Sequence, residues 1–272
     1  MQLRVVTWNL QGRERPDLGA VASAIVGFDV DVALLQEVQR SQTRSLARRL
    51  RWHHEWRFKH WPVVVAPEGL ALLSPRPLVD VERRILAMPW SLWSWRRRIA
   101  VGATLPHAGL RVVDTHLGAG VGDAERTRQA RVTIGMVGEG AGLVAGDLNT
   151  TPGSPVLRAY GDAGFLDAWA AVEQGEGGGD GSTNWKPGPR TEPPTQRLDY
   201  VLAGGGVRVV DAWVPTGDEA VERFGPLSDH VPLVVTLDVP GCPDRAGRPW
   251  PRRRRTWSHP TARCTGSRRR VG

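Results

Sequence analysis

The sequence has few of the features that mark secreted, membrane-spanning or disordered proteins. Its 272 residues include only two cysteines, which excludes a small fold held together by disulfides. No apolar run approaches the length of about 18 residues that a transmembrane helix needs. The start, MQLRVVTWNLQG, lacks the layout of a signal peptide. Since 40% of the residues are hydrophobic, the chain can bury a core, and we expect a cytoplasmic globular monomer.

Acidic residues are almost missing from the C-terminal segment. The chain has 36 Lys and Arg residues against 28 Asp and Glu, a net charge of +8. Residues 239–272 contain ten arginines and one acid, Asp244, so the remaining body has 26 basic and 27 acidic residues. This segment also holds five prolines and both cysteines and has no apolar periodicity. We therefore predict a folded domain at 1–238 and a disordered tail at 239–272, which serves either as an arm for nucleic acid or an anionic surface or only as a solvated end.

Short apolar runs separated by glycine and proline dominate the body. They predict strands at 3–10, 31–37, 69–74, 79–86, 98–105, 110–116, 142–149, 197–204, 207–214 and 230–239. Helical spacing is found at 16–27, 39–50 and 123–137. This order predicts an α+β fold, most simply a sandwich of sheets with helices outside. The Gly- and Pro-rich segment 173–196 predicts a long loop, and such loops are often functional.

Many of these strands run into a polar or ionisable residue near one end. The residues are Asn9, Glu37, His116, Asp147, Asn149, Asp199, Asp229 and His230. Because strand ends gather at one edge of a sandwich, side chains remote in sequence can converge there. Carboxylate and amide oxygens suit Mg²⁺, Mn²⁺ or Ca²⁺, and the set has no thiolate to favour zinc. Two histidines beside such a metal suit the hydrolysis of a phosphate ester.

Six motifs in order make the sequence resemble a known superfamily. They are VVTWNLQG, LLQEV, DTHLG, AGDLNTTP, QRLDYVL and LSDHVPL. Over residues 1–238 the chain is similar to the endonuclease/exonuclease/phosphatase superfamily, the deoxyribonuclease I-like metal-dependent phosphoesterases. The resemblance implies a four-layered α/β sandwich in which two mixed β-sheets pack face to face with helices outside. It also implies an active site at one end of the sandwich.

The resemblance implies a metal site formed by three of the polar residues. Glu37 would be the central ligand of a divalent ion, Mg²⁺ or Mn²⁺. Asn9 and Asp229 would complete or support this site.

The resemblance also implies roles for the remaining polar residues. Asp147 would orient or deprotonate the attacking water, and Asn149 would hold a phosphate oxygen. His230, oriented by Asp199, would bind the scissile phosphate and stabilise its charge. His116 would contact the phosphate from the other side, where it could act as an acid toward the leaving group.

The motifs narrow the substrate only in part. DTHLG and WNLQG depart from the patterns of abasic-site endonucleases and resemble the branch with deoxyribonuclease I, sphingomyelinases and deadenylases. We expect a phosphoester substrate, most simply the phosphodiester of a nucleic acid or a smaller phosphodiester. A sugar-phosphate or inositol-phosphate phosphatase is the alternative. A hypothesis of another class is a non-catalytic protein that binds nucleic acid through the basic tail.

Several other features allow both a functional and a structural interpretation. Arg96, Arg97 and Arg98 lie beside Trp90, Trp93 and Trp95. Such a cluster could stack bases, but we favour a solvated loop and strand edge with packed tryptophans. His53 and His54 are adjacent and would face opposite sides of a strand, which disfavours a metal site. Trp185 could be a platform for a base or headgroup, or could pack on the surface. GAGVGD lacks the third glycine of a dinucleotide-binding loop and is interpreted as a turn.

Overall fold

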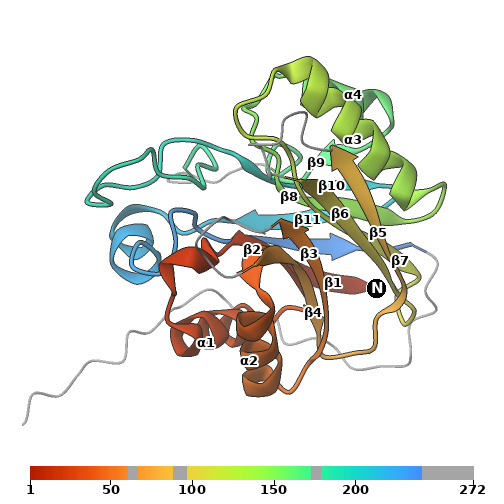
Figure 1. Cartoon of the computed structure of the whole chain (residues 1–272). Helices are drawn as coiled ribbons and strands as arrows, with labels where there is room; N and C mark the ends of the chain where they lie inside the picture. The colour runs from red at the N-terminus through yellow and green to blue at the C-terminus, as the bar shows by residue number, and fades with distance from the viewer. Residues whose placement is uncertain (61–66, 88–96, 173–178, 241–272) are drawn as a thin grey trace, which may run out of the picture. The chain divides into compact units, whose positions relative to one another are not determined.

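The computed structural model describes residues 1–60, 67–87, 97–172 and 179–240 (Figure 1). The strands are β1 (Gln2–Asn9), β2 (Val32–Gln39), β3 (His53–His60), β4 (Glu68–Ser74), β5 (Val79–Ala87), β6 (Arg98–Leu105), β7 (Leu110–His116), β8 (Gly142–Asp147), β9 (Leu166–Asp167), β10 (Asp199–Gly204), β11 (Arg208–Trp213) and β12 (Leu233–Asp238). The helices are α1 (Leu18–Phe28), α2 (Arg40–Leu50), α3 (Asp123–Val137) and α4 (Pro155–Asp162), with a 3₁₀ turn η1 (Gly12–Glu14) and a π-helical turn η2 (Glu219–Phe224). Among the described residues, no helix combines the length and apolarity needed to cross a bilayer.

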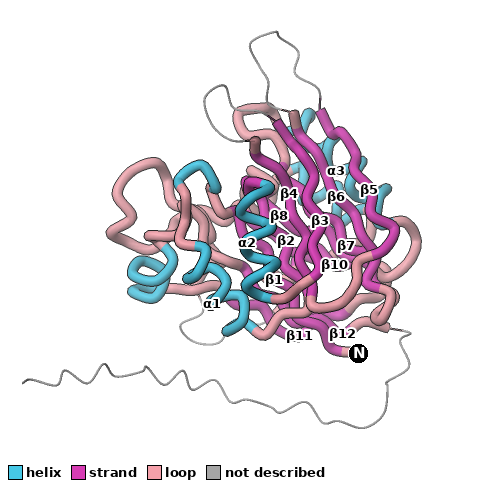
Figure 2. Tube along the Cα trace, turned by 60° about the horizontal axis from the view of Figure 1, so that its bottom comes forward, coloured by secondary structure: helices cyan, strands magenta, loops and turns pink. Residues whose placement is uncertain are grey.

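The strands form two six-stranded sheets. One has the order β11-β12-β1-β2-β4-β3 and the other β5-β6-β7-β8-β10-β9. β1 pairs with β2 in parallel, as β7 does with β8, and the other neighbours are antiparallel. Both sheets are therefore mixed, and Figure 2 shows their strands in magenta.

Three layers of apolar side chains hold the sandwich together. Leu34 of β2 and Val112 of β7 belong to the cluster between the two sheets. Ile25 of α1 packs in a second cluster on the outer face of the first sheet, and Tyr160 of α4 packs in a third on the outer face of the second. Figure 1 shows α1 and α2 below the sheets and α3 and α4 above them. The predicted four-layered α/β sandwich is confirmed.

The sequence-based prediction missed β3, β9 and α4 and the short turns η1 and η2, of which β3 and α4 are the longest. β3 extends the first sheet by pairing with β4. α4 begins after Ser154, whose hydroxyl accepts a hydrogen bond from the backbone N–H of Leu157 at 3.3 Å, and has a proline at its start. These are ordinary signals of a helix start that a short segment rich in glycine and proline obscured. Residues 241–272 of the predicted tail, with Cys242 and Cys264, lie outside the described residues, as do the three tryptophans and Arg96 of the expected basic cluster.

Gly146 allows β8 to approach β7 closely just before Asp147. Its φ is +139°, and a Cβ placed there would lie 1.9 Å from the carbonyl oxygen of Thr115. We expect Gly146→Ala to lower the free energy of unfolding by about 3 kcal/mol, measured by denaturant titration. Gly135→Ala, at an exposed position of α3 with open space around it, is the matched control and should stabilise by about 0.5–1 kcal/mol. Equal stability of the two variants would contradict the close approach.

Candidate active site

Strand register brings four of the predicted polar residues to one edge of the sandwich. His116 and Asp147 end the parallel strands β7 and β8 and pair directly, and Asp199 begins β10 opposite Asp147. Asn9 ends β1 in the other sheet, and its Nδ2 donates to Oδ2 of Asp147 at 3.2 Å. The two sheets therefore meet at Asp147. This convergence is what the sequence pattern predicted for these four positions.

His230 and Asp199 form a buried hydrogen-bonded pair. Nδ1 of His230 lies 2.6 Å from Oδ2 of Asp199, and the two residues are 5% and 0% exposed. Because a carboxylate only accepts hydrogen bonds, Nδ1 carries the proton. Burial disfavours the imidazolium, but the Asp199 carboxylate outweighs this effect and raises the pKa of His230 to about 10. His230 is therefore a fixed cation whose other nitrogen, Nε2, lies 3.9 Å from Oδ2 of Asp147.

Thr183 supports this pair from the long loop. Its hydroxyl donates to Oδ2 of Asp199 at 2.6 Å, and the backbone N–H of Asp199 donates back to the same hydroxyl at 3.1 Å. The backbone of the neighbouring Asn184 forms an isolated antiparallel β-bridge with that of His230. Its Nδ2 donates to the carbonyl oxygen of Asp229. The sequence predicted a long loop here but gave no role to Thr183.

Asp147 lies between the two histidines. Its Oδ2 is 3.5 Å from Nε2 of His116, and its Oδ1 accepts the backbone N–H of Asn149 at 2.9 Å. Burial raises the pKa of Asp147 to about 6, with the charges of Asp199 and Glu37 acting in the same direction and His230 opposing them. Asp147 can therefore exchange a proton near neutral pH.

Glu37 projects into the site from an irregular part of β2. The pairing of β2 with β4 shifts register between Leu35 and Val38, and Glu37 has a φ of +52°. Such bulges re-aim side chains and are frequent near active sites. Burial raises the pKa of Glu37, but the positive charges of Lys59 and His230 outweigh it and lower the pKa. Glu37 is therefore a stable carboxylate, and its side chain remains 22% exposed.

Two buried cations of this site were missed by the sequence analysis. Lys59, near the end of β3, is 1% exposed, and its Nζ lies 3.0 Å from Nδ1 of His116 and 3.7 Å from Oε1 of Glu37. Burial and the charge of Arg98 lower the pKa of Lys59 to about 8. Arg98 itself is 6% exposed, so its interpretation as a solvated strand edge was wrong. The run of arginines is typical of a solvated strand edge, but Arg98 is buried. Its charge lowers the pKa of both Glu37 and Lys59.

Asn149 and Asp229 complete the predicted set. Asn149 has a φ of +49° and donates through Nδ2 to the carbonyl oxygen of Leu117 at 3.1 Å. Asp229 is half-buried, and Oδ1 of its side chain lies 3.4 Å from the hydroxyl of Ser228. Burial raises the pKa of Asp229, His230 opposes this, and the nearby Glu37 carboxylate adds to the rise. The carboxylates of Asp229 and Glu37 repel each other, and a cation bound between them would stabilise both.

The donor set fits a hard divalent cation. Glu37 and Asp229 supply carboxylate oxygens, and Asn9 supplies an amide oxygen that otherwise accepts from the backbone N–H of Gln11 at 3.0 Å. Within the described ranges, no group of three or more His, Cys, Asp or Glu side chains is placed to hold a metal ion by itself. Mg²⁺ does not need one, because it keeps several waters and takes one or two carboxylates from the protein.

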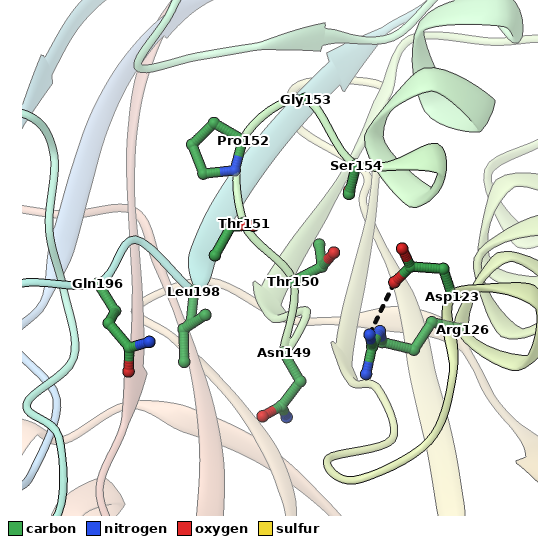
Figure 3. A pocket seen from close by; sticks show the side chains of 10 residues that line it. All are labelled: Asp123, Arg126, Asn149, Thr150, Thr151, Pro152, Gly153, Ser154, Gln196 and Leu198. Atoms are coloured by element: carbon green, nitrogen blue, oxygen red, sulfur yellow. Dashed lines mark hydrogen bonds and ion pairs between the residues drawn. The ribbon is translucent and has the colours of Figure 1, made fainter.

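A cavity of about 560 Å³ adjoins the cluster at Asn149 (Figure 3). Its lining residues are Asp123, Arg126, Asn149, Thr150, Thr151, Pro152, Gly153, Ser154, Gln196 and Leu198. Arg126 donates to Asp123 at 2.7 Å and to the carbonyl oxygens of Gly118 and Val121. The cavity is thus polar, and its one cation is balanced by a carboxylate.

The other sequence candidates lie outside this cluster. Trp185 is 6% exposed and packs in the core beneath η2, with Nε1 donating to the carbonyl oxygen of Glu192 at 2.5 Å, so it is packed rather than a free platform. His53 and His54 are exposed on β3. GAGVGD forms the turn that leads into α3.

The fold and the clustered carboxylates and histidines define a protein of the deoxyribonuclease I-like class. The chain belongs to the Endonuclease/Exonuclease/phosphatase family, whose sequence model matches residues 6–230. It is therefore a phosphoesterase of this superfamily, whose members are hydrolases that act on phosphoester bonds and generally use divalent metals.

Solved structures of this class share the fold at low sequence identity. An endonuclease/exonuclease/phosphatase from Bacteroides vulgatus is 20% identical, with a TM-score of 0.67 over 88% of this chain and 99% of that chain. The human Nocturnin catalytic domain is 20% identical, with a TM-score of 0.65 over 88% and 93%. A mannosyl-6-phosphatase from Bacteroides thetaiotaomicron is 15% identical, with a TM-score of 0.64 over 87% and 99%. Among curated proteins, none matches this chain. These likenesses show the fold alone.

Proposed function

We propose that this protein is a divalent-metal-dependent phosphodiesterase that uses Mg²⁺ or Mn²⁺. The observation that carries the proposal is the convergence of two histidines and a carboxylate at one edge of the sandwich. Nε2 of His116 and Nε2 of His230 lie 3.5 Å and 3.9 Å from the same oxygen of Asp147. Glu37 adds a second carboxylate 3.6 Å from the other ring nitrogen of His116.

The residues divide into a metal side and a proton-transfer side. Glu37, with Asn9 and Asp229, would hold the ion, and the bound ion would offset negative charge on the phosphoryl oxygens. Asp147 takes a proton from the attacking water, since its raised pKa leaves it basic near neutral pH. His230, held as a cation by Asp199, binds a phosphoryl oxygen and stabilises the charge that develops there.

The cavity beside Asn149 supports a substrate with a polar group next to the scissile phosphate. Hydroxyl and amide side chains line it, and its Asp123–Arg126 pair leaves no net charge from those two residues. The body at 1–238 has one more acidic than basic residue, which argues against an electropositive groove for duplex DNA. A short or single-stranded nucleic acid, or a smaller phosphodiester, is therefore the proposed substrate. The alternative is a sugar-phosphate or inositol-phosphate phosphatase, which would hydrolyse monoesters instead of diesters.

A metal-by-substrate screen of the full chain tests this function. Bis(p-nitrophenyl) phosphate and single-stranded DNA and RNA oligonucleotides supply phosphodiesters, while p-nitrophenyl phosphate and mannose 6-phosphate supply monoesters. We expect turnover of phosphodiesters with Mg²⁺ or Mn²⁺ that stops on addition of EDTA and returns with excess metal. His230→Ala is the control against a contaminating nuclease. Hydrolysis restricted to monoesters would replace the phosphodiesterase by a phosphatase, and equal rates in EDTA would refute metal dependence.

A further inference from the structure

Helix α2 carries a line of exposed arginines that the mechanism above does not use. Arg40, Arg44 and Arg48 recur at every fourth residue and are all exposed, while Leu46 and Ala47 bury the opposite face of the helix. Side chains four residues apart lie on one face of a helix, so these three form an arginine stripe. We propose that the arginine stripe is a track for the phosphate backbone of a single-stranded nucleic acid that leads to the active site. Binding along the stripe is a property of this surface alone, and its catalytic consequence rests on the proposed phosphodiesterase activity.

The arginine stripe lies in a stretch of chain that contains no acid. Residues 38–54 hold five arginines and no Asp or Glu, although the body at 1–238 has 27 acidic residues against 26 basic ones. Helix α1, which packs against α2, has no ionisable side chain. Glu55, the next acid along the chain, pairs with Arg57 at 2.7 Å. The positive charge of the stripe is therefore neutralised neither along α2 nor by the helix beside it.

The arginine stripe differs in this respect from exposed arginines on other elements. Arg84, Arg128 and Arg208 each form an ion pair with a nearby acid. Among the residues that the structure describes, no acid pairs with an arginine of the stripe, and Nε of Arg48 instead donates to the carbonyl oxygen of Arg44 at 3.3 Å. The guanidinium groups of the stripe are thus available to an anion from outside the chain.

The arginine stripe also works against the stability of its own helix. Arg40 is the first residue of α2, where the positive end of the helix dipole disfavours a cation, and the first turn contains no acid. Like charges four residues apart destabilise a helix further. Bound phosphates would relieve both effects. We expect such an arrangement on a surface that binds an anion.

Helix α2 begins at the edge of the sandwich that carries the active site. Two residues separate its start from Glu37, and Nε2 of Gln42 ties its first turn to the carbonyl oxygen of Gly12 at 2.8 Å. From Arg40 to Arg48 the stripe covers about 12 Å, because an α-helix rises about 1.5 Å per residue. A strand whose scissile phosphate lies at Glu37 can therefore continue along the stripe.

The spacing and composition of this surface favour an extended strand over a membrane. Neighbouring arginines of the stripe are about 6 Å apart along the helix axis, a spacing similar to that of consecutive phosphates in an extended strand. A guanidinium can bind a phosphate through two parallel hydrogen bonds, and each such contact releases counterions. A helix that lies on a membrane buries an apolar face, whereas α2, which is described over its whole length, exposes no large hydrophobic side chain.

Binding of a fluorescent single-stranded oligonucleotide to the full chain tests the track without turnover. An oligonucleotide of about 12 nucleotides, a length within the usual range of single-strand sites, is titrated in EDTA at several salt concentrations. We expect Arg44→Gln/Arg48→Gln to weaken binding by about 5- to 20-fold. The slope of log Kd against the logarithm of salt concentration should fall by about 1.4, since each lost contact with a single strand contributes about 0.7.

The matched control removes the same charge from two other exposed positions. Arg131→Gln/Arg208→Gln changes one arginine of α3 and one of β11, and should alter Kd by less than about twofold because distant surface charges are screened. Glutamine is nearly as good a helix former as arginine, and circular dichroism checks that both double variants fold. The arginines of residues 239–272 are present in all three proteins and contribute equally.

Kinetics test whether the strand on the track is the substrate. We expect Arg44→Gln/Arg48→Gln to raise KM for the same oligonucleotide by about 5- to 20-fold in the presence of Mg²⁺, with kcat unchanged, because the lost contacts are made equally in the ground state and the transition state. Hydrolysis of bis(p-nitrophenyl) phosphate should be unchanged, since this small diester occupies the active site without reaching along α2.

The outcomes separate this proposal from the proposed function. Equal Kd and salt slope for the wild type and Arg44→Gln/Arg48→Gln would overturn the track, even if the small diester were hydrolysed. Weaker strand binding by this variant of a protein without turnover would refute the phosphodiesterase activity and leave the track standing. Binding to phosphatidylserine vesicles that is lost in the variant, with strand binding unaffected, would make the stripe a membrane contact and overturn the proposal.

Discussion

Replacing Asp147 by asparagine is expected to lower kcat for phosphodiester hydrolysis by about 10³-fold, because proton transfer by a positioned base contributes about 10²–10⁴-fold. Oδ1 of Asp147 is held by the backbone N–H of Asn149 and Oδ2 by Asn9, so the carboxylate has one orientation. An amide keeps the size of the side chain but cannot accept the proton of the attacking water. The change should therefore appear in kcat with little effect on KM.

The activity of the wild-type enzyme should depend on pH through the protonation of Asp147. A base must be deprotonated, so wild-type activity should rise with pH through the pKa of Asp147, which burial raises to about 6. A bound divalent cation favours the carboxylate, so the midpoint in the metal-loaded enzyme should lie at or below 6. Asp147→Asn should lose this limb along with most of its rate.

Asp162→Asn is the matched control for Asp147→Asn. Asp162 is exposed at the end of α4 and lines neither the cavity nor the cluster. This change should leave kcat within about threefold of the wild type, since an exposed carboxylate contributes little. Circular dichroism and metal titration check that both variants fold and bind Mg²⁺. An Asp147→Asn enzyme within threefold of wild type would rule out Asp147 as the base.

The sequence was sufficient for the strand ends because their pattern is local. Runs such as LVAGD and RLDYV combine a buried apolar strand with a carboxylate at the end, and this combination is visible without knowledge of the fold. The sequence could not show that His116 and Asp199 both lie opposite Asp147, since that depends on the register of β7, β8 and β10. The contact of Asn9 with Asp147 depends further on the packing of one sheet on the other.

Lys59 and Arg98 could not be assigned from the sequence for a physical reason. A lysine or arginine in a polar run is most often solvated, and here both lie in such runs, HHEWRFKH and WRRRI. The charges of Glu37, Glu68 and Asp147, from strands remote in the chain, favour the buried Lys59 cation, and Arg98 acts on Glu37. The one indication that Lys59 belongs to the site is its position near the end of a strand, as for the other polar residues of the site.

Trp185 shows the limit of the same reasoning for apolar residues. A tryptophan in a Gly- and Pro-rich loop suits either a stacking platform or a packed anchor. The structure packs it in the cluster with Phe224 and Leu227 of the segment before Asp229. The loop is therefore anchored by its tryptophan, and the adjacent Thr183 is placed against Asp199.

Replacing Glu37 by glutamine is expected to remove nearly all metal-dependent activity, with kcat/KM lower by about 10³-fold or more at a fixed low Mg²⁺ concentration. Glu37 is the carboxylate of the cluster whose pKa is lowered and whose side chain stays partly exposed, so it is charged and accessible to a cation. Glutamine keeps the shape and one carbonyl oxygen but removes the charge that attracts Mg²⁺. The loss should therefore appear first as weaker metal binding, measured by calorimetric titration of Mg²⁺ and Mn²⁺.

Replacing Glu37 by glutamine should also lower the stability of the protein. Glu37 also faces the buried Lys59, and removal of one partner of a buried charge pair costs about 3–5 kcal/mol. Thermal unfolding of Glu37→Gln without metal measures this loss, so that weaker metal binding is not confused with partial unfolding. Glu55→Gln, in the half-exposed pair with Arg57 on β3, should change neither metal affinity nor rate. Glutamine removes the charge of Glu37 and keeps its shape. A folded Glu37→Gln enzyme with unchanged Mg²⁺ affinity would therefore show that other residues bind the metal.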